Sequence, residues 1–303
     1  MKRCSGLSAT SSYSALLARG WCGIISDMNR QDRNGHNQRS ATPLNSGVSR
    51  SVLGSLAALL ALLPPETMSA PEATQPLTTN GIAVIELFHS DGCSSCPPAD
   101  ELVGKLALKA RKQGTPIYVL SHHVDYWNRL GWKDPYSSKA ATRRQRACVR
   151  ALKLKAAWTP CAIINGAKLL PFRRVNATIQ QALKKPALAQ IAVSDLAVKD
   201  NTLTISATVT GALGDSAVYL AVVERGLVVS VSAGENKGKT LHHSATVRAS
   251  VLVALPEHGP ASLKAQIPAD LKPSNATAIV LVQDKKTMRV LAASSTDLPP
   301  SAR

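Results

Sequence analysis

The sequence has few cysteines, few aromatic residues and only one long apolar run. Six cysteines stand at positions 4, 22, 93, 96, 148 and 161 of 303 residues. This number and scatter are atypical of a fold built on disulfides, so one reactive pair is the better expectation. Aromatic residues make up 4% of the chain. The longest apolar run, Val52 to Leu63, has about a dozen residues, whereas a membrane-spanning helix needs about 20.

Acidic residues are also scarce. The chain has 36 Lys and Arg against 19 Asp and Glu, which gives a formal net charge of +17. Such an excess is compatible with nucleic acid, an anionic membrane surface or acidic partners. The sequence contains no zinc-finger spacing, no aromatic RNA-binding signature and no long polybasic tail. We therefore predict no nucleic-acid partner and assign most of the positive charge to a solvated surface.

The first 70 residues read as a targeting segment. Residues 1–50 are polar, and the apolar run that follows them ends at Pro64 before the small residues of Met68 to Ala70. This order is typical of a signal peptide, so we predict a periplasmic or secreted protein with no transmembrane span after cleavage. Because a signal normally begins close to its apolar stretch, we hypothesise that translation starts at Met28. Residues 71–80 are predicted to be a linker.

The stretch from Ile82 to Lys112 carries the most informative pattern. Ile82 to Phe88 has the length and the apolar character of a buried strand, and a helical period begins after Cys93-Ser-Ser-Cys96. A cysteine at a helix N-terminus is favoured as the thiolate, which is the nucleophilic form. We predict that Cys93 attacks a partner and that Cys96 resolves the mixed disulfide. A structural disulfide and half of a metal site are the alternatives.

In the rest of the chain, the pattern of apolar residues changes at about residue 187. Before it, the patterns predict a second buried strand parallel to the first, a basic helix, a proline-led strand with a hairpin partner, and a closing helix (116–124, 137–156, 160–166, 168–172 and 176–185). After it, short apolar or alternating runs separated by turns predict an all-β sandwich (203–210, 217–224 and 278–283).

The order of these elements resembles the thioredoxin fold. In that fold a cis proline begins the third strand and lies against the CxxC pair. The resemblance implies this role for Pro160, since X–Pro is the only common site of a cis peptide bond. We predict an α/β thioredoxin-like domain over residues 81–186, followed by an all-β sandwich-like domain over residues 187–298.

A second resemblance is more specific. Five stretches are similar to an exported bacterial family named domain of unknown function 1223: VIELFHSDGCSSCPPADELV, HVDYWNRLGWKDPYSS, RRQRACVRAL, WTPCAIING and GENKGKTLHHSATVRA. The resemblance implies a thioredoxin-like domain, a β-rich C-terminal domain and export, but no reaction. The chain departs from the usual family residues at three positions, which hold Cys148, Cys161 and His89.

Polar residues follow the predicted second strand and suggest two kinds of chemistry. His122, His123 and Asp125 leave its carboxyl end, where the CxxC pair is also expected. One hypothesis is that His123, oriented by Asp125, exchanges a proton with a cysteine. Another is a copper or zinc site formed by Cys93 and Cys96 with His122 or His123. A histidine satisfied within its own loop is the third reading.

Three further features remain open in the sequence. Cys161 is a candidate third thiol beside Pro160, Cys148 reads as a small buried residue, and a disulfide between the two is an alternative. The basic helix is interpreted as a solvated face. The glycine-rich turn from Gly234 to Leu241 lacks the spacing of a nucleotide-binding loop, and the family resemblance suggests that it docks on the first domain.

The sequence thus predicts an exported thiol–disulfide oxidoreductase that acts through Cys93 and Cys96 on a protein thiol or disulfide, without an organic cofactor. The alternatives are a periplasmic copper- or zinc-binding protein that uses Cys93, Cys96 and His123, and a non-catalytic envelope interaction protein.

Overall fold

The computed structural model describes residues 80–211 and 213–299. The predicted signal peptide, the hypothetical start at Met28, Cys4, Cys22 and the linker up to residue 79 lie outside the described residues.

Strands dominate the described residues. The helices are α2 (Pro97–Gln113), α3 (Lys139–Ala151) and α4 (Val175–Leu183), with short 3-10 helices η1 (Asp125–Leu130), η2 (Phe172–Arg174) and η3 (Pro273–Asn275). The strands of the first half are β1 (Ala83–His89), β2 (Ile117–His123), β3 (Cys161–Ile164) and β4 (Lys168–Leu169). Those of the second half are β5 (Ala189–Lys199), β6 (Thr202–Gly211), β7 (Ser216–Glu224), β8 (Leu227–Ser230), β9 (Thr240–His243), β10 (Thr246–Ala254), β11 (Ala261–Gln266), β12 (Ala276–Asp284) and β13 (Val290–Asp297).

Local sequence explains the start and end of α2. Cys96 occupies the N-cap position and prolines fill the first two helical positions, where no intrahelical N–H bond is lost. Leu102, Val103 and Leu106 recur on the face that is buried. The helix ends at Gly114, whose φ of 63° is the left-handed conformation that a glycine adopts without strain.

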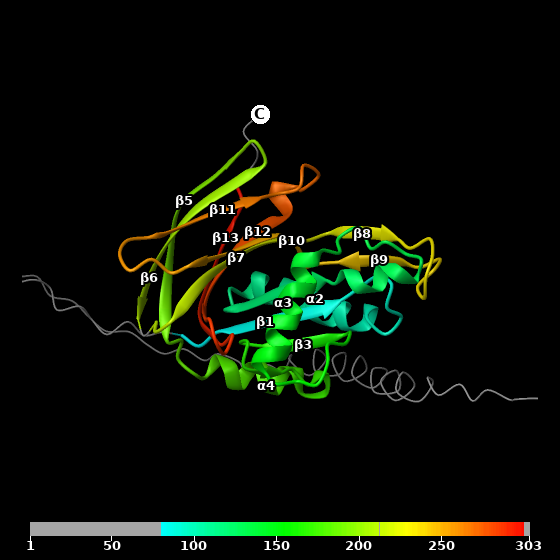
Figure 1. The fold of residues 1–303 in the computed structure, drawn as a ribbon, viewed down its shortest axis with the longest axis horizontal. Coiled ribbons are helices and arrows are strands. Elements are labelled where there is room, and N and C mark those ends of the chain that lie inside the picture. Colours follow the sequence, from blue (N-terminus) through cyan, green and yellow to red (C-terminus); the bar gives the residue numbers. More distant parts are fainter. Residues whose placement is uncertain (1–79, 212, 300–303) are drawn as a thin grey trace, which may run out of the picture. The chain divides into compact units, whose positions relative to one another are not determined.

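Eight strands form one mixed sheet in the order β13-β12-β7-β10-β2-β1-β3-β4 (Figure 1). The junction is a short parallel contact between β10 and β2, at Thr246 and Ser121. The predicted fold class, a thioredoxin-like domain followed by a separate sandwich, is therefore wrong: the C-terminal strands extend the sheet that contains β1 and β2. The physical reason is that apolar patterns locate strands but carry little information on which distant strand covers a free edge.

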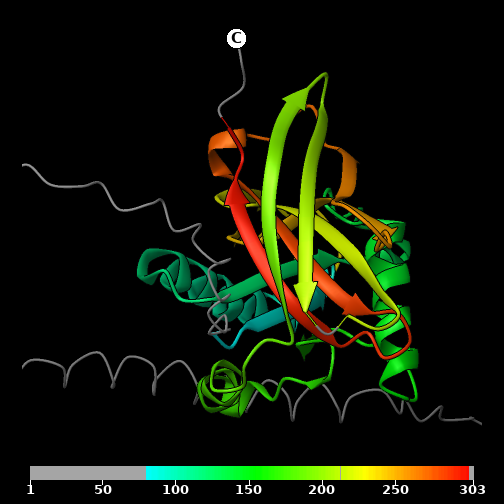
Figure 2. The same cartoon turned by 90° about the vertical axis from the view of Figure 1, so that its left-hand side faces the viewer.

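A second, three-stranded sheet in the order β11-β6-β5 packs against the large sheet (Figure 2). Their shared core contains side chains that are buried completely, such as Leu203, Ile205, Leu220, Leu263 and Val280. The hairpin of β8 and β9 forms its own two-stranded sheet. Its buried residues pack with Trp132 and Tyr136 of the first half, so the hairpin reaches the region of the cysteine pair.

The alternation of β1 directs its side chains to two different helices. Glu86 contacts Arg144 of α3, whereas His89 lies 3.5 Å from Asp100 of α2. Because successive side chains of a strand point to opposite faces, α2 and α3 cover opposite faces of β1. One strand thus carries a buried ion pair on one face and polar residues of a second cluster on the other.

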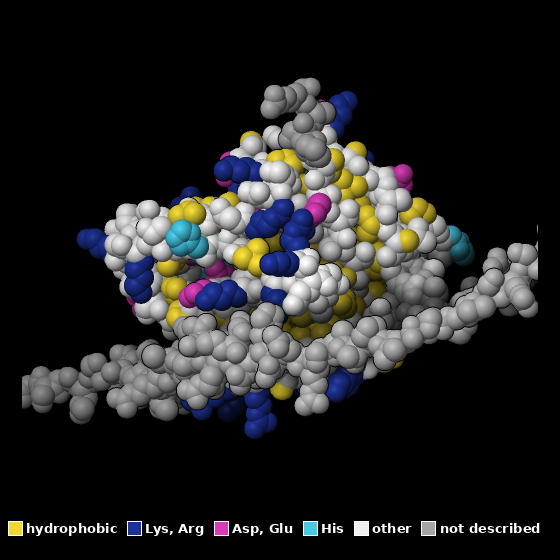
Figure 3. Space-filling view, turned by 180° about the vertical axis from the view of Figure 1, so that it is seen from behind, with side chains coloured by type: hydrophobic (Ala, Val, Ile, Leu, Met, Phe, Trp, Pro, Cys, Tyr) yellow, Lys and Arg dark blue, Asp and Glu magenta, His cyan; other side chains and the backbone are white. Residues whose placement is uncertain are grey.

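On the face shown in Figure 3, basic side chains lie in several separate groups, with uncharged and apolar side chains between them. Among the described residues, no helix combines the length and apolar character that crossing a membrane requires.

Candidate functional site: a buried disulfide beside a histidine–aspartate cluster

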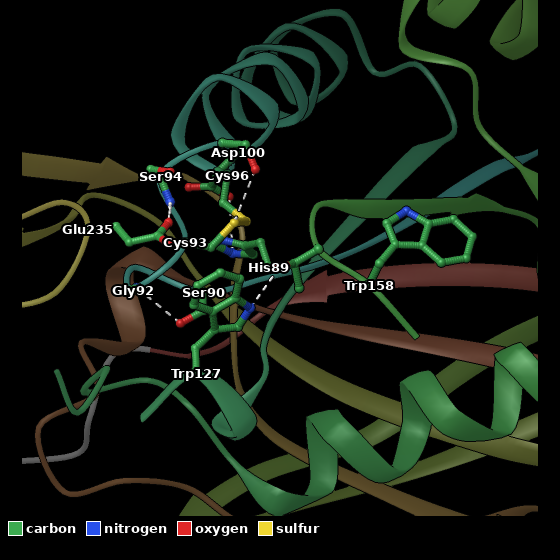
Figure 4. The surroundings of a disulfide bond; sticks show 12 residues. His89, Ser90, Gly92, Cys93, Ser94, Cys96, Asp100, Trp127, Trp158 and Glu235 are labelled. Carbon is green, nitrogen blue, oxygen red and sulfur yellow. Dashed lines mark hydrogen bonds and ion pairs between the residues drawn. A yellow bond between two sulfur atoms is a disulfide. The ribbon is translucent and has the colours of Figure 1, made fainter. Parts of the chain in front are cut away.

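Cys93 and Cys96 form a disulfide with their Cα atoms 5.4 Å apart. Both residues are buried, with exposed fractions of 1% and 0%, although Ser94 between them is exposed. The pair lies where the turn after β1 enters α2 (Figure 4). A thiol in solution therefore reaches the sulfur atoms only after the residues that bury them have moved.

The surroundings favour Cys93 as the reactive sulfur. Its Sγ atom lies 3.4 Å from the hydroxyl oxygen of Ser95, which can donate a hydrogen bond to a thiolate. The first two residues of α2 are prolines and have no N–H, and the N–H groups of Ala99 and Asp100 already donate to the carbonyl of Cys96. The stabilisation of a thiolate by unpaired N–H groups is thus reduced. The Ser95 hydroxyl and the helix dipole are the groups that remain to stabilise it.

Residues 231–239, here called the cover loop, connect β8 to β9 and bind the backbone of the segment that carries Cys93. Asn236 is 0% exposed, and its amide nitrogen donates to the carbonyl oxygens of Asp91 (2.7 Å) and Cys93 (2.9 Å). Glu235 accepts a hydrogen bond of 2.9 Å from the N–H of Ser94 (Figure 4). The glycine-rich turn therefore docks on the first half, as the family resemblance suggested.

Behind the disulfide lies a histidine–aspartate cluster, which consists of His89, Asp91, Asp100, His123, Asp134 and His243 and is buried throughout. His243 Nδ1 contacts Asp100 Oδ2 at 2.7 Å, and its Nε2 lies 3.4 Å from Asp91 Oδ1. His123 Nδ1 contacts Asp134 Oδ2 at 2.9 Å. The rings of His89 and His123 are tilted against each other with centroids 4.1 Å apart.

The cluster shifts the pKa values of its members in opposite directions. Burial, aided by the charge of His123, lowers the pKa of His89 to about 4. Burial also opposes the charged form of His243, but its hydrogen bond to Asp100 and the carboxylate of Asp91 outweigh this effect and raise its pKa to about 10. For Asp100 burial would raise the pKa, yet His89 and His243 hold it well below the usual range. The cluster therefore contains carboxylates that stay ionised beside one histidine that stays neutral.

The polar residues predicted to act together at the end of the second strand are separated in the structure. His123 belongs to the cluster, but its carboxylate partner is Asp134; Asp125 instead accepts a hydrogen bond of 2.6 Å from the hydroxyl of Thr142. His122 points to the other face of the sheet, where its Nε2 atom lies 3.2 Å from Glu86. The sulfurs of Cys93 and Cys96 are bonded to each other, so the predicted metal set of the two cysteines with His122 or His123 is not assembled.

The remaining predicted residues lie near the third strand. The Thr159–Pro160 peptide bond is cis, as expected. Cys148 and Cys161 are both buried and free, and they pack in one core cluster with Phe88. Burial raises the pKa of the Cys161 thiol to about 12 and raises that of Cys148 further. Cys148 is the small buried residue that the sequence predicted, and Cys161 is an unreactive thiol in this environment.

Five cluster members and one residue of the cover loop were missed as site residues from the sequence: His89, Asp91, Asp100, Asp134, His243 and Asn236. The His-x-Asp spacing at the end of β1 was one signal that could have found Asp91, because it places two polar residues beside the cysteine pair. The signal for Asn236 and His243 was the family stretch GENKGKTLHH, which lies far along the chain. Their convergence depends on the docking of the β8–β9 hairpin.

The family model described as protein of unknown function, DUF1223, matches residues 84–283. The chain belongs to this family. A crystal structure of a protein from Agrobacterium tumefaciens is similar, with 28% identity, a TM-score of 0.52, and coverage of 74% of this chain and 97% of that one. A domain of the outer membrane lipoprotein Omp28 from Porphyromonas gingivalis gives 12% identity, a TM-score of 0.26, and coverage of 38% of this chain and 92% of that one. No curated protein matches the chain.

The matched range contains Cys93 and Cys96, every residue of the histidine–aspartate cluster and the cover loop. The matched range also spans strands of both halves of the eight-stranded sheet. The family therefore corresponds to the joined sheet rather than to either half of the chain.

Proposed function

We propose that this DUF1223 protein is an exported thiol–disulfide oxidoreductase that exchanges electrons with protein thiols through Cys93 and Cys96. The observation that carries the proposal is the difference among the four described cysteines. Cys93 and Cys96 are bonded at the start of a helix, beside a hydroxyl donor, whereas Cys148 and Cys161 are free, buried thiols with raised pKa values.

The exchange proceeds in two steps. A substrate thiolate attacks Cys93 Sγ, the bond between the two cysteines breaks, and Cys96 leaves as a thiolate that takes up a proton. The second substrate thiolate then attacks the mixed disulfide and releases Cys93 as a thiolate. Two electrons pass to the protein and the substrate gains a disulfide; the reverse reaction begins with Cys93 and is resolved by Cys96.

Exposed positions of the cover loop suggest how the substrate gains access. Asn236 is held by two hydrogen bonds at its buried amide, but its neighbours Glu235 and Lys237 are exposed. Gly234 and Gly238 have φ values of 77° and 82°, a region that favours glycine. In the proposed cycle the loop opens, the substrate binds over Ser94, and the loop closes again after exchange.

Redox equilibrium tests the proposal. The folded protein is incubated with mixtures of reduced and oxidised glutathione, the free thiols are alkylated, and the modified residues are mapped by mass spectrometry. We expect the Cys93–Cys96 bond to open and close reversibly with the glutathione ratio while the melting curve stays cooperative. A disulfide that opens only in denaturant is structural, and this result would refute the proposal.

The cover loop gives a second prediction. Asn236→Ala removes two hydrogen bonds that hold the closed loop, together worth about 1–3 kcal/mol. Since 1.4 kcal/mol is a tenfold change in an equilibrium, we expect the disulfide to react with dithiothreitol about 5- to 100-fold faster. The matched control is Lys237→Ala, at an exposed position of the same loop, which should react at the wild-type rate. Equal rates for all three proteins would show that the loop does not limit access.

A further inference from the structure

The histidine–aspartate cluster contains buried polar atoms that the chain itself does not satisfy. Among the described residues, the Nε2 atoms of His89, His123 and His243 and both carboxylate oxygens of Asp91 have no hydrogen-bond partner. Two of the Nε2 atoms face a carboxylate at a longer distance, His89 at 3.5 Å from Asp100 and His243 at 3.4 Å from Asp91. The three histidines and Asp91 are 1–3% exposed. Leaving a buried polar group without a partner costs about 1–3 kcal/mol, so several in one place indicate a missing ligand.

Three residues of the cluster, His89, Asp91 and His123, are close enough to share one ligand, and His243 lies beside Asp91. One donor atom from each of His89, Asp91 and His123 lies within 4.8 Å of the others. His243 Nε2 is 3.4 Å from Asp91 Oδ1, which is the separation of about 3.4 Å that two ligands of a tetrahedral zinc ion have when their bonds are about 2.0–2.2 Å long.

Two of the histidines are also oriented as metal ligands usually are. A histidine that binds a metal through one nitrogen commonly donates the other N–H to a carboxylate, which fixes the ring. His243 is held in this way by Asp100 at 2.7 Å, and His123 by Asp134 at 2.9 Å. In both rings the other nitrogen, Nε2, is the unpartnered atom.

The charges point in the same direction. Asp91, Asp100 and Asp134 are buried together, and in the described part of the chain all their ion pairs are with histidines. Burying three carboxylates is costly unless positive charge accompanies them. A divalent cation supplies that charge while leaving the imidazoles neutral, which is the form that binds metal.

We propose that His89, Asp91, His123 and His243 form a binding site for one divalent transition-metal ion, with zinc as the ion that suits three imidazoles and one carboxylate. The site does not use sulfur and therefore goes beyond the proposed exchange reaction. A cavity of about 310 Å³ is lined by His89, Asp91 and His243 together with residues at the start of α2 and on β9. The cavity thus lies beside three of the four proposed ligands.

Zinc titration against a competing chelator, followed by metal analysis after gel filtration, tests the site on the full chain. The wild type should retain one zinc ion per chain. His243→Gln, which removes a ligand, should weaken binding by 100-fold or more. His242→Gln changes the exposed neighbouring histidine and should bind as the wild type does.

Two further proteins keep the result interpretable. Asp134→Asn retains the shape of the carboxylate that orients His123 and should weaken zinc about 10- to 100-fold, so it decides the question if His243→Gln does not fold. The double variant Cys93→Ser/Cys96→Ser should retain its zinc. With cobalt in place of zinc, the near-ultraviolet spectrum should lack a sulfur-to-metal charge-transfer band.

Three results would overturn the metal site: no stoichiometric zinc in the wild type, wild-type affinity in both His243→Gln and Asp134→Asn, or loss of zinc in the cysteine double variant. The first would mean that protons alone balance the cluster, and the last would move the metal to the sulfurs. The glutathione experiment is read out on the cysteines alone, so either proposal can fail without the other.

Discussion

Replacing Arg144 with methionine is expected to lower the free energy of unfolding by about 3–5 kcal/mol. The guanidinium donates to both carboxylate oxygens of Glu86 and, at 3.1 Å, to the side chain of Gln283. It also lies over the ring of Tyr219, 3.7 Å from the centroid. Arg144 thus connects α3 to strands of both halves of the sheet, and its removal leaves a buried carboxylate without its main partner.

The measurement is urea unfolding of the wild type, Arg144→Met and the control Arg143→Met. Arg143 is exposed on the same helix, and its replacement should change the unfolding free energy by less than about 0.5 kcal/mol. Glu86→Leu combined with Arg144→Met removes both charges and should recover most of the loss. If Arg144→Met is as stable as Arg143→Met, the ion pair does not hold the two halves together.

The pH dependence of this effect follows from Glu86. Burial alone would raise the pKa of Glu86, but the charges of Arg144 and His122 outweigh it and lower the pKa to about 2. A carboxylate with a lowered pKa stabilises the fold fully above its unfolded-state pKa, near 4.5, and loses that contribution as the pH falls toward 2. The stability difference between wild type and Arg144→Met should therefore be largest near pH 7 and shrink as the pH falls toward 2.

Cys93→Ser is expected to abolish disulfide transfer, and Cys96→Ser to stop it after the first step. Without Cys93 no mixed disulfide forms at the attacked sulfur. Without Cys96 the reduced Cys93 attacks a substrate disulfide but is not released by an internal thiol, so the mixed disulfide accumulates. Mass spectrometry of the Cys96→Ser protein with a disulfide-containing peptide should show one peptide per chain on Cys93.

The control for these variants is Cys148→Ala/Cys161→Ala. Both thiols are buried with raised pKa values, so their removal should leave the transfer rate unchanged even if stability falls. Accumulation of the peptide on Cys96 in the Cys93→Ser protein, at the wild-type rate, would reverse the assigned roles of the two sulfurs.

Local patterns predicted much of the secondary structure. The strands around Ile85 and Val119, the helix after Cys96 and the strand from Cys161 appear close to their expected positions. These elements depend on the spacing of apolar residues and on proline and glycine at their ends, which are local properties. The cis bond before Pro160 was expected from the resemblance to the thioredoxin fold, and proline is the only common site of such a bond.

Long-range pairing was the part that local patterns did not determine. β10 joins β2 through one pair of residues, Thr246 and Ser121, and this contact places the second half of the chain in the same sheet. Once joined, the β8–β9 hairpin brings Asn236 and His243 to residues more than 140 positions earlier, at Cys93 and Asp100. No periodicity in a single sequence encodes such a contact, so Asn236 and His243 were not found.

The structure pairs His123 with Asp134 and not, as the sequence predicted, with Asp125, and this difference has a similar explanation. Both acidic residues follow His123 within a short distance, and proximity in sequence favoured the nearer one. Asp125 begins η1 and accepts a hydrogen bond from the hydroxyl of Thr142 in α3. The chain then folds back, so that the carboxylate of Asp134 contacts His123 Nδ1 and accepts a hydrogen bond from the N–H of Asp91. The path of the loop between them, not the residue types, selects the partner.

Single-turnover disulfide transfer from the oxidised wild-type protein to a reduced peptide with two cysteines tests the central claim most directly. Alkylation and mass spectrometry would follow both molecules in native buffer. We predict that the peptide gains one disulfide as Cys93 and Cys96 become alkylated together, with Cys148 and Cys161 unmodified. A peptide that remains reduced while the Cys93–Cys96 bond stays closed in the folded protein would contradict this account and make the disulfide a structural one.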